Sequence, residues 1–168
     1  ALALGWALSR DVRAADLVAR AEDRLEAPLA EAPGLDRLQA STAASLLERA
    51  RALGRRDDEL LGRLAYARAL EDFQRGDLVL AEGEISTARR RLGRDADLEV
   101  LAAAVARGRQ RFDAARAALA GALELEPTHP HGRLLAADLA LDADDGAAAL
   151  EHLDRLAEAH PEVAAIHN

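Results

Sequence analysis

Apolar residues recur every three or four positions along much of the chain, with charged residues between them. Leu78, Ala81, Ile85, Ala88 and Leu92 form one such series. This spacing places the side chains on one face of an α-helix, because the helix turns once every 3.6 residues. Two further series have the same spacing: Phe112, Ala115, Leu119 and Ala122, and Ala149, Leu153 and Leu156. The pattern therefore predicts a run of amphipathic helices.

Turn-forming residues separate the predicted helices. Gly76-Asp77 and Asp144-Asp145-Gly146 stand where the pattern breaks, and aspartate side chains at such sites accept hydrogen bonds from the free amides of the next helix. Pro130 and Pro161 suit the first position of a helix, where a missing N–H costs nothing.

The first sixty residues follow the pattern more loosely. Breaks at Pro28 and Pro33-Gly34 predict one helix over about residues 7–27 and another over about residues 36–54. The first is expected to bury a stripe consisting of Leu8, Val12, Ala15 and Ala19. The second is expected to bury Ala43, Leu47 and Ala50.

Three segments of equal length, residues 62–95, 96–129 and 130–163, align with one another without a gap. Small residues, large apolar residues and helix breakers all recur in this one frame. The matching positions are Ala69, Ala103 and Ala137; Ala81, Ala115 and Ala149; Ile85, Leu119 and Leu153; Ala88, Ala122 and Leu156; and Gly93, Pro127 and Pro161. Such a period of 34 residues predicts a repeat architecture.

The aligned segments resemble the tetratricopeptide repeat in their length, in their small residues where helices approach closely, and in their closing proline. The residues from Phe112 to Pro127 match the family's second helix best, with Ala115, Leu119 and Ala122 on its signature positions. The first helices depart from the family, which typically has tryptophan where this chain has Ala65, Glu99 and Arg133.

The resemblance implies an all-α fold, a right-handed solenoid of antiparallel helical hairpins with about eight helices. Residues 1–61 would form a degenerate N-terminal hairpin that caps the stack. Residues 62–163 would form the three repeats, and residues 164–168 would start a truncated or capping helix. Terminal repeats of a solenoid are often atypical because they close its core.

Composition supports this fold and narrows the function. Half of the residues are apolar but only 2% are aromatic, and alanine and leucine, both strong helix formers, supply most of the rest. The net charge of −8 argues against nucleic acid as the main partner. The absence of cysteine excludes disulfides, thiolate metal sites and a cysteine nucleophile. The frequent use of arginine and alanine suggests a bacterial origin. The sequence is compatible with a location in either the cytoplasm or the periplasm.

No motif of catalysis or cofactor binding is present, so the sequence predicts a protein that is not an enzyme and uses no cofactor or metal. Glu126 and His129 have the spacing of a metal-binding pair, but Pro127 lies between them at a predicted helix end. The acidic cluster Asp142, Asp144 and Asp145 lacks the spacing of a calcium loop and is interpreted as helix capping. His129 and His131 are expected to flank a turn. His152, His160 and His167 are expected to scatter over the surface.

Two arginine clusters follow predicted helix ends. They consist of Arg49, Arg51, Arg55 and Arg56, and of Arg89, Arg90, Arg91 and Arg94. Cations at these ends complement the partial negative charge of the free carbonyl groups. A site for phosphate or for an acidic partner is the functional alternative.

The resemblance to the repeat family also implies a concave groove lined by the first helix of each repeat. The implied groove positions are Arg63, Tyr66, Leu70 and Phe73, then Val100, Ala104 and Arg107, then Leu134, Asp138 and Leu141. This apolar set suits an amphipathic helix or an extended apolar segment of a protein partner. Alternatively, the chain's own N-terminal helices cover these side chains.

The sequence thus favours a protein–protein interaction scaffold or adaptor that presents a groove to a peptide or helix. The alternative is a membrane-tethered assembly factor, with the repeat domain as its soluble part. Its tether would precede Ala1, because the apolar stretch from Ala1 to Leu8 is much shorter than the roughly 20 residues that span a bilayer.

Overall fold

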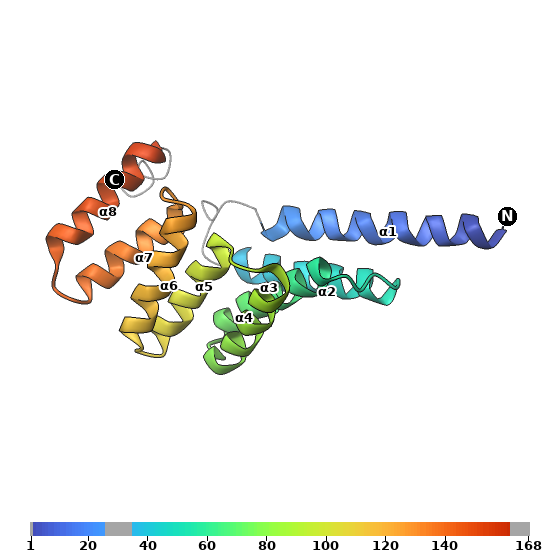
Figure 1. Cartoon of the computed structure of the whole chain (residues 1–168), viewed down its shortest axis with the longest axis horizontal. Coiled ribbons are helices and arrows are strands. Elements are labelled where there is room, and N and C mark those ends of the chain that lie inside the picture. The colour runs from blue at the N-terminus through green and yellow to red at the C-terminus, as the bar shows by residue number, and fades with distance from the viewer. Residues whose placement is uncertain (1, 26–34, 162–168) are drawn as a thin grey trace. The chain divides into compact units, whose positions relative to one another are not determined.

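A computed structural model describes residues 2–25 and 35–161, with side chains described over residues 10–25 and 39–161. Every regular element in this part of the chain is an α-helix, which confirms the predicted all-α class (Figure 1). The eight helices found there are α1 (Leu2–Leu25), α2 (Leu35–Ala52), α3 (Asp58–Arg75), α4 (Leu78–Leu92), α5 (Ala96–Gly108), α6 (Phe112–Leu125), α7 (Pro130–Leu141) and α8 (Gly146–Ala159).

Successive helices pack in pairs as hairpins (Figure 1). The chain divides into two compact units, Ala1–Gly93 with α1 to α4 and Arg94–Asn168 with α5 to α8. We refer to these as unit 1 and unit 2. The division into a cap over residues 1–61 and three repeats over residues 62–163 stays a prediction, as does a further helix over residues 164–168.

Two helix boundaries differ from the sequence expectation. Helix α1 begins at Leu2, five residues before the predicted start, because the leucine and alanine residues of this stretch continue the helical sequence. Helix α2 ends at Ala52, and Gly54 follows with a φ of +106°, a left-handed conformation that suits glycine. The side chains of the apolar stretch before Arg10 lie outside the described residues, so the tether hypothesis is not tested.

Aspartate side chains cap the start of α3, α5 and α8, and the cap of α8 was predicted. The carboxylates of Asp57, Asp95 and Asp145 each accept a hydrogen bond from a backbone N–H in the first turn of the helix that follows. Pro130 occupies the start of α7, as expected. The acidic cluster before Gly146 therefore supplies a helix cap through Asp145.

Asp77 was expected to cap α4 with its side chain, and this prediction is wrong. Its backbone N–H donates to the carbonyl of Asp72, while Gly76 at a φ of +84° donates to Phe73. These two bonds close α3 with the αL turn that glycine favours. The backbone of Asp77 is committed to this turn, and its side chain makes no capping bond.

The core of unit 1 lies where α1, α2 and α3 meet. Helix α2 contributes Ala43, Leu47 and Ala50, all fully buried as the sequence pattern predicted. Helix α3 contributes Leu60 and Leu64.

The stripe predicted for α1 is wrong. The buried side chains are Ala14, Leu17, Val18 and Ala21, whereas Val12 is exposed. This buried face is rotated around the helix from the predicted one. It also includes Leu25, which packs against the same cluster.

Small residues of the repeated frame lie in the buried core. Ala69, Ala103, Ala81 and Ala115 are fully buried, and Ala137 is nearly so. One aligned position behaves differently: Leu153 on α8 is 38% exposed, whereas its counterparts Ile85 and Leu119 are buried. Leu119 is covered within unit 2 by residues of α7, the first helix of the hairpin that follows it.

Candidate functional site

The groove positions predicted on α3 form a partly exposed surface in unit 1. Arg63, Tyr66, Leu70 and Phe73 are all of intermediate exposure. The Arg63 Nε atom lies 3.2 Å from the Glu22 carboxylate of α1. The end of α1 thus reaches the first groove position, while Tyr66, Leu70 and Phe73 retain accessible area.

The groove positions predicted on α5 and α7 meet in unit 2. The Arg107 guanidinium donates to Asp138 at 3.1 Å and to Asp142 at 2.7 Å. The sequence interpretation assigned both Arg107 and Asp138 to the groove, but it did not predict that they pair or that Asp142 joins them. The hydrogen bond from Arg107 holds the pKa of Asp142 below its usual value. This arginine is therefore committed to two acids of its own chain.

The apolar groove positions of unit 2 divide into buried and open residues. Val100 is buried and packs in the core, so it is not available to a partner, contrary to its predicted place in the groove. Ala104 and Leu134 are half-buried, and Leu141 is 56% exposed. We call Ala104, Arg107, Leu134, Asp138 and Leu141 the α5–α7 face.

A buried histidine, rather than a surface one, begins α7. His129 is 3% exposed, and its Nε2 atom lies 2.8 Å from the Asp97 carboxylate on α5. The backbone N–H of Gly132 donates to Nδ1 of His129 at 3.2 Å. In the neutral ring the proton therefore stands on Nε2 and is donated to Asp97.

Histidine and arginine side chains also fix the loop between α6 and α7. Buried Arg133 donates through Nε to the Pro127 carbonyl at 2.8 Å, and its Nη1 lies 3.0 Å from Nδ1 of His152. The ring of His160 bonds to the Thr128 carbonyl. His152 and His160 are thus structural partners of this loop, not scattered surface residues as predicted; His167 lies outside the described residues.

The arginine clusters do lie at helix ends as predicted, with Arg49 and Arg51 in the last turn of α2 and Arg89, Arg90 and Arg91 in the last turn of α4. Arg51, Arg55, Arg91 and Arg94 of the two clusters all pair with acids of the chain. Arg55 donates to Asp57 at 2.7 Å, and Arg91 pairs with Asp58. These pairs favour the structural interpretation over a phosphate site.

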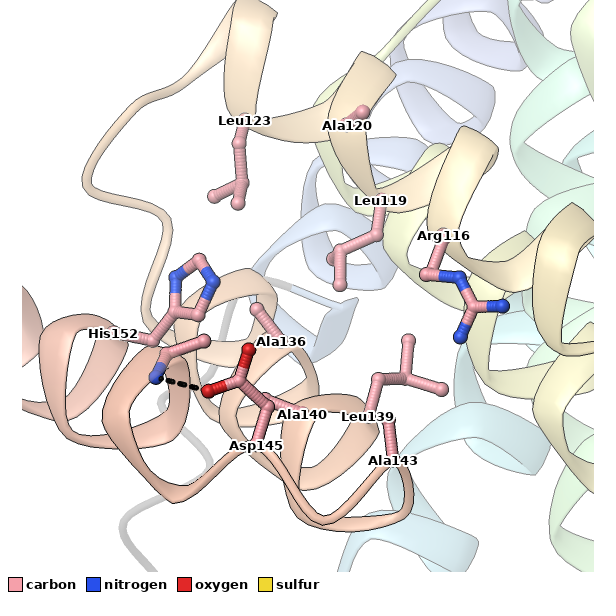
Figure 2. A pocket seen from close by; sticks show the side chains of 11 residues that line it. Arg116, Leu119, Ala120, Leu123, Ala136, Leu139, Ala140, Ala143, Asp145 and His152 are labelled. Carbon is pink, nitrogen blue, oxygen red and sulfur yellow. Dashed lines mark hydrogen bonds between the residues drawn. The ribbon is translucent and has the colours of Figure 1, made fainter.

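A hollow of about 380 Å³ lies between α6, α7 and α8 (Figure 2). It is mainly apolar, and polar groups stand only on its edges. The lining residues are Arg116, Leu119, Ala120 and Leu123 of α6, Ala136, Leu139, Ala140 and Ala143 along α7 and its end, and Asp145, Ala148 and His152 of α8 and its cap. Sequence reasoning did not find this hollow, which we call the α6–α8 trough.

The trough and the α5–α7 face lie on opposite sides of α7. Leu134, Asp138 and Leu141 share one face because they are spaced by four and three residues. Ala136, Ala140 and Ala143 have the same spacing but are offset by two residues, about 200° around the helix. Unit 2 therefore presents two separate surfaces.

Within residues 2–25 and 35–161, no group of three His, Cys, Asp or Glu side chains is placed to hold a metal ion. Among the same residues, no helix is both long and apolar enough to cross a bilayer.

The contact between His129 and Asp97 gives unit 2 a predicted dependence on pH. The hydrogen bond that His129 donates to Asp97 raises the pKa of His129 above 6.5 against the effect of burial, and the same bond lowers the pKa of Asp97 below 3.8. The stabilisation from His129 is fully present below pH 6.5 and is lost as the pH rises through its folded-state pKa. The stabilisation from Asp97 is present above pH 3.8 and is lost as the pH falls through the folded-state pKa of Asp97.

Asp97→Asn is therefore expected to lower the free energy of unfolding most between the folded-state pKa values of Asp97 and His129. The loss should be smaller at about pH 8.5 than at about pH 5.5. Because the Asp97 side chain is largely exposed, the difference should stay below about 1 kcal/mol. Urea unfolding at the two pH values measures it. Asp113→Asn is the matched control, since Asp113 pairs with Arg116, which keeps its charge throughout. An equal cost of Asp97→Asn at both pH values would contradict the assignment.

Comparison with known proteins agrees with this architecture. Residues 106–168 match a family model described as a tetratricopeptide repeat. No curated protein shows significant similarity to the chain. This match supports the resemblance to the tetratricopeptide repeat that the sequence indicated. Repeats of this family are generally protein–protein interaction modules and typically not enzymes.

Proposed function

We propose, from the premise that residues 106–168 match the tetratricopeptide repeat family, that this protein is a scaffold or adaptor that binds a peptide or helix of a partner protein. The α5–α7 face in unit 2 and the partly exposed residues Tyr66, Leu70 and Phe73 of α3 in unit 1 are the proposed contact surfaces. The main support for this proposal is that Leu134 and Leu141 are accessible on the α5–α7 face, beside the ion pairs of Arg107.

The charge of the α5–α7 face indicates the chemistry of the partner. Arg107 is shared between Asp138 and Asp142, so these three groups carry one net negative charge. A partner segment that combines apolar side chains with a basic residue complements such a surface. An apolar face bordered by fixed charge is the usual arrangement for seating an amphipathic helix.

The test replaces one contact residue in each unit with a charged one. Tyr66→Glu combined with Leu134→Glu should reduce capture of the partner from extracts of the producing cells at least about tenfold, because each carboxylate would be desolvated against an apolar partner. Both positions are partly exposed, so the helical circular dichroism signal should be unchanged. Quantitative mass spectrometry of cross-linked, captured proteins gives the measurement.

The matched control places the same charge on exposed apolar residues outside the proposed surfaces. Val79 of α4 and Leu150 of α8 are 68% and 62% exposed. Val79→Glu with Leu150→Glu should leave capture intact. If both double variants capture the same proteins to the same extent as the parent, the proposed surfaces are not the interface.

A further inference from the structure

We infer that the α6–α8 trough seats two apolar side chains of one amphipathic helix from a partner protein. This inference rests on the proposed function, that the chain binds a helix or peptide, and adds a second binding surface to the α5–α7 face. The trough has the shape, the lining and the edge charges that such a helix requires.

Three rows of side chains give the trough its shape. One wall is a row on α6, Arg116, Ala120 and Leu123, whose members are three or four residues apart. The other wall is a row with the same spacing, consisting of Asp145, Ala148 and His152. Residues with this spacing form a ridge along their helix, so the trough has one ridge on each side.

Alanines of α7 form the floor between these ridges. Ala136, Ala140 and Ala143 line the bottom of the trough. Leu119 of α6 and Leu139 of α7 project into it (Figure 2). Alanine side chains are too short to fill the space between α6 and α8. Small residues on a floor of this kind let another helix approach closely, as they do at tight helix crossings.

The length of the floor favours a helical occupant. Ala136 and Ala143 are seven residues apart on a helical path, which corresponds to about 10 Å, or roughly two turns of a bound helix. Two apolar side chains spaced i and i+4 on the partner span one turn and fit this length. The volume of about 380 Å³ lies in the range of sites that enclose a ligand group.

The edges of the trough carry polar groups of different kinds. Arg116 lies on the α6 wall, and Asp145 lies on the opposite wall at the start of α8 (Figure 2). On the same wall as Asp145, Nδ1 of His152 accepts from Arg133, so the neutral ring presents its Nε2–H as a donor. Burial, aided by the charge of Arg133, lowers the pKa of His152 and keeps this neutral form.

These edge groups specify the partner further. Arg116 pairs with Asp113, and one oxygen of Asp145 accepts from the Ala148 N–H. A bound helix with an acidic residue that shares the Arg116 guanidinium with Asp113, and a basic residue on the Asp145 side, matches the charges of the two walls. A free carbonyl at the C-terminal end of that helix matches the donor of His152, because the last four carbonyls of a helix lack partners within it.

The experiment compares the same substitution on the two faces of unit 2. Ala140→Leu fills the trough from its floor, and Ala104→Leu adds the same atoms to the α5–α7 face. Leucine is close to alanine in helix propensity, and both positions are half-buried, so both variants should keep the parent's melting temperature. Ala148→Leu, which narrows the trough from α8, is the second blocking variant if Ala140→Leu melts lower.

The probe is a displayed library of 16-residue helical peptides with Leu, Ile or Phe at two positions four residues apart and varied polar positions. The most enriched peptide is then titrated against each variant by fluorescence anisotropy. Blocking the trough should weaken its binding by about tenfold or more, and Ala104→Leu should change it by less than about twofold. Methyl resonances of Leu119, Leu123 and Leu139 should shift on binding, and that of Leu134 should not.

Two outcomes overturn the inference in different ways. If Ala104→Leu or the Tyr66→Glu and Leu134→Glu variant weakens the peptide while Ala140→Leu does not, the helix binds the predicted groove, and the proposed function stands without the trough. If no peptide is enriched above a library with alanine at the two apolar positions, the trough does not seat such a helix. The proposed function is then decided by partner capture alone.

Discussion

Replacing Leu47 with alanine is expected to lower the free energy of unfolding of unit 1 by about 2–5 kcal/mol. Leu47 is among the largest side chains that are completely buried, and it lies between α1 and α3 in the core of this unit. Removing most of its side chain deletes apolar contacts and leaves a cavity that the surrounding helices fill only in part. The expected loss is a large share of the 5–15 kcal/mol that stabilise a typical domain.

Intrinsic fluorescence during urea unfolding measures this loss in unit 1. The only tryptophan and the only tyrosine of the sequence, Trp6 and Tyr66, both belong to unit 1. Leu150→Ala is the matched control, because Leu150 is an exposed leucine of unit 2 and its removal should cost no more than about 0.5 kcal/mol. A loss below about 1 kcal/mol for Leu47→Ala would show that α2 is not packed as described.

The helical hairpins and much of the core were predictable from the sequence, because short-range periodicity determines them. Ala43, Leu47 and Ala50 have helical spacing in the sequence, and the structure buries all three. The small residues of the repeated frame, such as Ala81 and Ala115, are buried for the same reason. A helix with one dominant apolar stripe needs only its own pattern to specify the buried face.

The rotation of α1 was not predictable from one stripe of residues. An alanine-rich helix offers several apolar stripes of nearly equal strength, and the partner helix decides which is buried. The stripe through Leu17 and Val18 packs against α2 and α3, whereas Val12 points into solvent. Tertiary packing therefore selects among faces that the sequence leaves close in energy.

The contacts of the histidines were not predicted for another reason. His129 and Asp97 are 32 residues apart, and His152 lies 19 residues from Arg133. No local pattern relates such pairs, although His129 and Asp95 occupy the same position of the repeated frame and both act as helix caps. This shared capping position is the one signal by which a structural role for His129 was detectable in the sequence.

The exposure of the groove positions depends on packing between helices, which the sequence pattern does not specify. Leu134 is half-buried and Leu141 is exposed, whereas Val100 is buried because core residues of α6 and α7 pack around it. The α6–α8 trough was not predictable, since it arises from space that alanines on three helices fail to fill. Whether such space exists depends on the distances between helices, which no single segment encodes.

The second large effect is expected from Ala115→Leu, which should lower the free energy of unfolding by about 1–3 kcal/mol. Ala115 is fully buried in the core of unit 2, where α6 packs against α5 and α7. A leucine there has no free volume to enter, so it must displace a helix or adopt a strained rotamer. Thermal and urea unfolding followed by circular dichroism at 222 nm provide the measurement.

Ala114→Leu separates overpacking from every other effect of this substitution. Ala114 precedes Ala115 on the same helix but is exposed, so a leucine there adds the same atoms without meeting the core. Leucine and alanine have similar helix propensities, and the control should therefore stay within about 0.5 kcal/mol of the parent. Because the two variants have the same composition and differ by one position, their difference isolates the cost of close packing. Equal stability of the two would mean that α6 does not cross its neighbours closely at Ala115.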